Sequence, residues 1–187
     1  YLSYTGLLEP LGRSQVLSYL SRLSDAYAFT LVSFEKPADL EDRDAVASLR
    51  GECVQYGIDW QPQVYHHRPR MLATFWDVLV LLWQTFRHSF RGDVLLVHCR
   101  SYIPALAAWL CGKLTKTPFI FDMRALWPEE MITAGRLRRG SWAHRVLVAI
   151  ERACLRRAAG VVSLTEAAVA HLRETYPGEM RGQRVIV

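Results

Sequence analysis

The chain has 187 residues, a length that suits one domain and is short for two ordinary ones. Its apolar content of 51% is enough for a buried core and argues against a disordered chain. The net charge of +5 favours anionic partners such as phosphorylated ligands, lipid headgroups or nucleic acid, without choosing among them.

The four cysteines are widely separated, and no C-x-x-C pair occurs among Cys53, Cys99, Cys111 and Cys154. This spacing disfavours a disulfide scaffold or a zinc site and indicates reduced thiols. No signal peptide opens the sequence. We therefore expect a cytoplasmic protein without a bound metal.

Short apolar runs alternate with longer helical stretches along the chain. In chain order we predict the end of a strand at Tyr1–Ser3, a helix at Ser14–Asp25, a strand at Phe29–Phe34, a helix at Leu40–Tyr56, an edge-like, partly polar strand at Ile58–Tyr65, a helix at Met71–Phe90, a strand at Val94–His98, a helix at Ser101–Leu114, a strand at Pro118–Met123, a helix at Ser141–Ala158, a strand at Gly160–Leu164, a helix at Thr165–Tyr176 and the start of a strand at Arg184–Val187. Apolar strands separated by helices predict an α/β fold: a doubly wound parallel sheet with helices on both faces, Rossmann-like in type.

The predicted helix Met71–Phe90 resembles a membrane span in composition. However, it contains Asp77 and Gln84, whereas spanning needs about 20 nearly uncharged residues. Basic residues flank it at Arg68, Arg70, Arg87 and Arg91. Two interpretations remain open: the helix is buried against the sheet, or it lies along an anionic membrane surface.

In an open parallel sheet, ligands bind beyond the carboxyl ends of the strands. This rule selects a short set of candidate substrate-binding residues. They are Gly6, Gly12, Arg13 and Gln15 after the first strand, His98, Arg100 and Ser101 after the VLLVH strand, and Glu129 and Glu130 beyond the PFIFDM strand.

Gly12 is predicted to start a helix, where unpaired backbone N–H groups and the helix dipole favour a phosphate. The loop before it is neither G-x-G-x-x-G nor a P-loop, so a familiar dinucleotide or nucleoside triphosphate site is not supported. A plain strand-to-helix turn is the alternative.

Asp122 and Arg124 are the candidate catalytic residues, at the end of an otherwise apolar strand. A buried carboxylate needs a partner, and Arg124 could simply be that partner. Alternation along a strand points both side chains to the same side. His98 ends the matching strand, either as a ligand-binding residue or as a hydrogen-bonded core histidine. Thr165 fits a helix N-cap, so we assign it no chemistry.

The segment from Arg136 to Arg157 contains seven arginines and a single acidic residue, Glu151. Exposed arginines attract phosphates, but most such segments are solvated faces. No helix-turn-helix, RNP-type pattern or other nucleic-acid module is found. We therefore predict no nucleic-acid partner.

Four segments together resemble the N-terminal domain of GT-B-fold glycosyltransferases of family 4 (group 1). They are the first loop leading to GRSQVLSYL, then DVLLVHCRSYIPALAA, then PFIFDMRALWPEE, and last ERACLRRAAGVVSLTEAA. The resemblance implies a metal-independent, retaining transfer of a sugar from a nucleotide-sugar co-substrate to a glycan, lipid-linked or small-molecule acceptor, with no cofactor. It also implies that Gly12 approaches the donor diphosphate, that Asp122 lines the cleft and that His98 and Arg100 line the acceptor pocket.

The donor-binding domain of that family, with its E-x7-E carboxylates, is not found in the sequence. We therefore expect the 187-residue chain to be a single acceptor-side domain that folds alone but transfers no sugar. Two alternatives stay open. The chain could be a subunit of a naturally split transferase, or a non-catalytic Rossmann-like module that binds a phosphorylated ligand.

Overall fold

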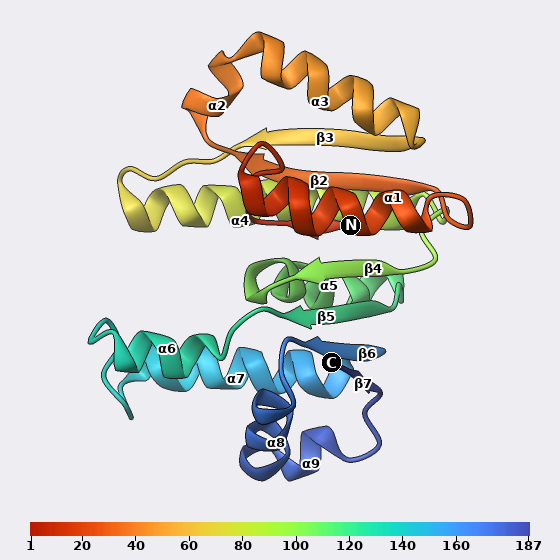
Figure 1. Cartoon of the computed structure of the whole chain (residues 1–187). Coiled ribbons are helices and arrows are strands. Elements are labelled where there is room, and N and C mark those ends of the chain that lie inside the picture. Colours follow the sequence, from red (N-terminus) through yellow and green to blue (C-terminus); the bar gives the residue numbers. More distant parts are fainter. The chain divides into compact units, whose positions relative to one another are not determined.

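The computed structural model describes residues 1–187, except for the side chains of Arg70 and Met71. The chain divides into two compact units, Tyr1–Gln84 and Thr85–Val187. In each unit, parallel strands are joined by helices (Figure 1). The predicted α/β, Rossmann-like fold class is therefore confirmed.

The first unit has three parallel strands in the order β3-β2-β1. Its elements are β1 (Leu2–Ser3), a π-helical turn η1 (Gly12–Leu17) that continues as α1 (Ser18–Leu23), β2 (Phe29–Glu35), α2 (Pro37–Glu41), α3 (Arg43–Gln55), β3 (Ile58–Val64) and α4 (Arg70–Phe90), whose last turns belong to the second unit. β3 lies at the edge of this order, as predicted. An edge strand tolerates Pro62, which has no backbone donor.

The core of the first unit forms where the helices bury their apolar stripes on the strands. Val16, Leu17 and Leu20 lie on one helical face, as their spacing predicts, and pack with Leu31 and Trp60 of the sheet. The predicted helix Leu40–Tyr56 is two helices. It breaks at Asp42, whose side chain caps α3 by accepting from the backbone N–H of Ala45 at 3.0 Å.

The second unit has four parallel strands in the order β4-β5-β6-β7. Its elements are β4 (Val97–Arg100), α5 (Tyr102–Thr115), β5 (Phe119–Met123), α6 (Trp127–Thr133), α7 (Trp142–Arg157), β6 (Gly160–Ser163), α8 (Glu166–Thr175), α9 (Pro177–Met180) and β7 (Val185–Ile186). Within each unit, strands that follow one another in the sequence lie side by side and parallel.

β4 begins later than predicted. The apolar composition placed a buried strand at Val94–His98, but pairing starts at Val97, whose N–H donates to the carbonyl of Pro118 at 3.0 Å. The side chain of Leu95 lies before this pairing and is 83% exposed. The shift brings Arg100 into the strand.

Helix α4 buries a stripe of mostly small or polar residues and exposes a stripe of large apolar ones. The buried residues recur every four positions, at Ala73, Asp77, Leu81, Thr85 and Ser89. The exposed stripe carries Leu72, Phe75, Trp76, Leu79, Trp83 and Phe90. None of the described helices combines the length and the hydropathy needed to cross a bilayer. The predicted flanking role of Arg70 falls outside the described side chains.

Candidate active site

Three predicted site residues meet near the carboxyl end of β5, although β4 runs on to Arg100, so His98 lies within that strand and not at its end as predicted. Asp122 is fully buried, and its Oδ2 accepts from Arg124, with Nε at 3.0 Å and Nη2 at 2.8 Å. Nε2 of His98 lies 3.2 Å from the same oxygen. Both partners retain some exposure, 15% for the side chain of His98 and 28% for that of Arg124. Asp122 thus joins two partly accessible nitrogen groups at this rim.

The charge state of Asp122 reflects two opposing effects. Burial by itself raises the pKa of this carboxyl group. The hydrogen bond from His98 and the charge of Arg124 together outweigh burial, so the pKa lies below its ordinary value. The carboxylate is therefore ionised at neutral pH. Its second oxygen, Oδ1, is buried and has no hydrogen-bond partner among the described residues.

The strand ends around Asp122 are fixed by the sheet register. Arg100 of β4 lies beside Asp122 of β5 and is itself buried. Ser101 follows with a φ of 78°, a value that non-glycine residues seldom adopt, and its N–H donates to the Asp122 carbonyl at 2.8 Å. Backbone strain of this kind is concentrated at functional sites. The structure therefore brings Arg100 and Ser101 to the same rim as Asp122.

A buried carboxylate that the sequence analysis left unassigned supports the loop after β5. Glu151 of α7 accepts from the hydroxyls of Tyr102 and Tyr176, each at 2.5 Å. The Tyr102 hydroxyl also accepts from the backbone N–H of Trp127 at 3.2 Å. Burial raises the pKa of Glu151, against the effect of the two tyrosine hydrogen bonds. This cluster holds the start of α6 close to the rim.

In the first unit, Glu35 holds the first loop, which runs from Gly6 to Gly12. Glu35 is a fully buried residue at the end of β2. Its carboxylate accepts from the backbone N–H groups of Leu7 at 2.7 Å and Leu8 at 3.0 Å. A Cβ on Gly6 would lie 2.6 Å from Oε2 of Glu35, and one on Gly12 would lie 2.1 Å from the carbonyl oxygen of Gly6. The two glycines therefore allow the loop, the helix start and the carboxylate to pack without side chains between them.

The remaining predicted residues lie on the surface. Arg13 and Gln15 both lie on η1. Nη2 of Arg13 donates to Glu52 of α3 at 2.6 Å, and the side chain of Gln15 is exposed. Glu129 pairs with Arg139, with Nη2 2.5 Å from Oε2, while Glu130 is exposed. Arg13 and Glu129 thus take part in exposed ion pairs, which contribute little to stability. None of these contacts joins them to Asp122.

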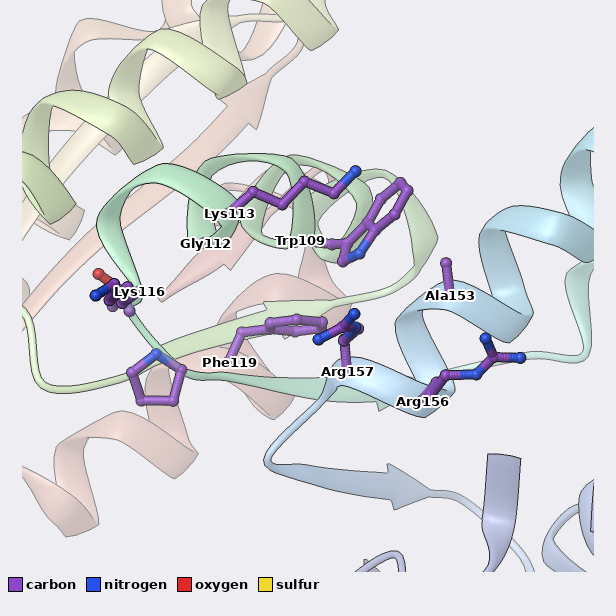
Figure 2. A pocket seen from close by; sticks show the side chains of 10 residues that line it. Trp109, Gly112, Lys113, Lys116, Phe119, Ala153, Arg156 and Arg157 are labelled. Carbon is purple, nitrogen blue, oxygen red and sulfur yellow. The ribbon is translucent and has the colours of Figure 1, made fainter. Parts of the chain in front are cut away.

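A cavity of about 620 Å³ lies at the other end of β5 (Figure 2). Its basic side chains come from the last turns of α5 and α7 and the residues just beyond, including Lys113, Lys116 and Arg157. Cations there offset the negative end of a helix dipole. Lys113 also stacks over the ring of Trp109, at 4.0 Å from its centroid. None of the predicted site residues lines this cavity.

The family model described as a glycosyl transferase 4-like domain matches residues 13–187. No curated protein matches the chain.

Proposed function

Because the chain belongs to the glycosyl transferase 4-like domain family, we propose that it is the acceptor-side domain of an enzyme that transfers a sugar from a nucleotide-sugar to an acceptor hydroxyl. In this reaction the bond between the anomeric carbon and the diphosphate oxygen breaks. A bond between that carbon and the acceptor oxygen forms, and the hydroxyl proton is released. The leaving diphosphate gains negative charge as its bond breaks.

One observation supports this assignment most strongly. A fully buried, ionised Asp122 is shared by His98 and Arg124 near the carboxyl ends of two adjacent strands, where ligands of parallel sheets bind. A guanidinium held in place before the reaction stabilises developing negative charge more effectively than one that must reorganise. We propose that Asp122 fixes Arg124 and His98 for this purpose, and that Arg100 and Ser101 complete the rim.

The first loop has a complementary role in the proposal. Gly6 and Gly12 are buried and let the loop pack closely against Glu35 and against itself, and η1 begins at Gly12. We propose that this loop contacts the donor diphosphate, with Arg13, Gln15, Glu129 and Glu130 as outer contacts of the substrates. The transfer proceeds with retention and without a metal ion, as the family resemblance implies.

We propose further that the nucleoside is held by a separate donor-binding domain, so that this chain folds alone but transfers no sugar. The test of function uses the full-length protein with a panel of nucleotide-sugars and glycan or lipid-linked acceptors. Acceptor-dependent release of nucleoside diphosphate is the expected result. Binding of the nucleotide-sugar without any release would instead identify a non-catalytic module. Activity that requires a second, separately encoded chain would identify a split transferase.

A second proposal concerns the exposed stripe of α4. Phe75, Trp76 and Trp83 present aromatic rings to solvent, and Arg87 and Arg91 are exposed at the end of the helix. Aromatic residues favour the interface of a bilayer, and arginines favour anionic headgroups. We propose that α4 docks the enzyme on an anionic membrane surface, which would bring it to lipid-linked acceptors.

A further inference from the structure

A second buried carboxylate, Asp77, lies at the carboxyl rim of the first unit. Oδ1 of Asp77 on α4 is 2.6 Å from Nδ1 of His66, and Oδ2 accepts from the backbone N–H of His66 at 3.1 Å. The hydroxyl of Tyr4 donates to the same Oδ2 at 2.9 Å. His66 follows β3 and Tyr4 follows β1, so the cluster joins the ends of two strands to α4.

Asp77 occupies a costly position. It is fully buried in an apolar helix, where an unpaired carboxylate would be strongly unfavourable. Three hydrogen bonds offset this cost. Burial and the neighbouring carboxylate raise the pKa of Tyr4, so its hydroxyl stays protonated and remains a donor. The centroid of the Tyr4 ring lies 5.1 Å from that of the Phe34 ring and 5.5 Å from that of the Tyr65 ring.

This arrangement fixes the imidazole of His66 in one orientation. Because Asp77 accepts from Nδ1, Nε2 is the ring nitrogen that remains for a ligand, and in the neutral ring it accepts a hydrogen bond. The side chain of His66 is 44% exposed, whereas that of Asp77 is fully buried. The buried residue thus serves to orient the accessible one.

We propose that His66 binds a sugar hydroxyl of the acceptor through Nε2, with Asp77 as a positioning residue. A ring nitrogen with a lone pair accepts hydrogen bonds, and the acceptor substrate of a sugar transferase presents hydroxyl donors. This inference rests on the proposed function only in naming the hydroxyl as part of the glycosyl acceptor. It is otherwise independent of Asp122.

The kinetic test compares His66→Gln with His67→Gln in the full-length enzyme. His67 is the exposed neighbour of His66 in the same loop and is the matched control. Loss of one hydrogen bond raises the acceptor KM about tenfold in His66→Gln and lowers the ratio of transfer to donor hydrolysis by a similar factor. His67→Gln behaves as wild type. An acceptor KM for His66→Gln equal to that of wild type overturns the inference while leaving the transferase assignment intact.

An NMR titration tests binding at His66 without relying on the enzyme assay. The histidine rings of the full-length protein are labelled with ¹⁵N and titrated with the methyl glycosides of glucose, mannose and galactose. The His66 Nε2 signal shifts with at least one of these sugars, and the response is lost in Asp77→Asn. If the protein transfers no sugar at all, the proposed function fails, and this signal alone decides whether His66 binds a hydroxyl. A signal that does not move with any sugar overturns the inference.

Discussion

Asp122 combines complete burial with a lowered pKa, and this combination requires compensation. His98 and Arg124 provide it through one carboxylate oxygen, leaving Oδ1 without a partner among the described residues. Removing one member of a buried pair costs more than the pair itself contributes, because the remaining charge is left uncompensated. The same contacts therefore bear on folding stability and on the proposed chemistry.

The lowered pKa of Asp122 predicts an acid-dependent loss of stability. The unfolded chain binds this proton more readily than the folded one, so stability rises with pH in the acid range. The contribution of Asp122 is present above its ordinary pKa of about 4 and is lost as pH falls through the lower folded value. The melting temperature of the wild-type protein should therefore fall more steeply as the pH is lowered than that of Asp122→Asn. Parallel curves would contradict the shift.

The close approach at Gly12 predicts a large effect of one methyl group. Gly12→Ala places a Cβ against the backbone of Gly6 and should destabilise the fold by about 1–3 kcal/mol. Gly51→Ala on α3 is the control, since its Cβ meets nothing within 4 Å and alanine favours a helix by about 1 kcal/mol. Urea unfolding measures both. Equal midpoints for the two variants would show that the loop yields to the added methyl group.

Some site contacts follow from sequence and others do not. Alternation along β5 predicts that Asp122 and Arg124 share a side, and their ion pair confirms it. The partners of Glu35 are backbone N–H groups of a loop 27 and 28 positions away, and no residue pattern identifies them. A carboxylate at Asp77 in an otherwise apolar helix indicates that a polar partner must lie nearby. The sequence does not identify His66 as that partner, because its position depends on the path of the loop after β3.

At the scale of elements, helix α4 shows how composition leaves orientation open. Its apolar side chains gather on one side, a pattern that ordinarily predicts burial of that side, but the structure exposes it. Asp77 settles the orientation, because the carboxylate faces Tyr4 and His66 and turns the aromatic stripe outward. Composition also leaves the first residue of a strand undecided, since the apolar residues Leu95 and Leu96 precede β4 and do not form part of it.

The membrane proposal predicts a separation between stability and bilayer binding on α4. Trp83 is 64% exposed, so Trp83→Ser should leave unfolding unchanged. Burial of one large apolar side chain contributes about 1.5–3 kcal/mol, so flotation with anionic vesicles at low salt should weaken about tenfold or more. Trp142→Ser, at an exposed tryptophan on α7, is the matched control. Equal flotation of wild type and both variants would exclude α4 as the docking surface.

The residue that caps the start of α8 was predictable from the sequence. Thr165 caps α8 as expected, accepting from the N–H of Ala168 at 3.1 Å. Thr165→Ala should therefore lower the free energy of unfolding by about 1 kcal/mol and leave transfer unaffected. Urea titration and the transfer assay check the two halves of this statement. A large loss of transfer at unchanged stability would give Thr165 a direct role that its geometry does not suggest.

At the scale of the molecule, each unit carries buried carboxylates at the carboxyl ends of its strands. Glu35 and Asp77 organise the rim of the first unit, and Asp122 organises that of the second. The alternation of elements predicted this parallel α/β architecture, because each βα step leaves a loop at the same end of a strand. Sequence patterns could not predict which carboxylates would be buried, since burial depends on packing between distant segments.

The most direct measurement is kcat/KM for sugar transfer by the full-length protein carrying Asp122→Asn, with Asp93→Asn as an exposed control close to β4. Asp122→Asn removes the charge that holds Arg124 and His98, so transfer should fall at least about tenfold, while Asp93→Asn should match wild type. Transfer by a correctly folded Asp122→Asn enzyme at the wild-type rate would contradict the account.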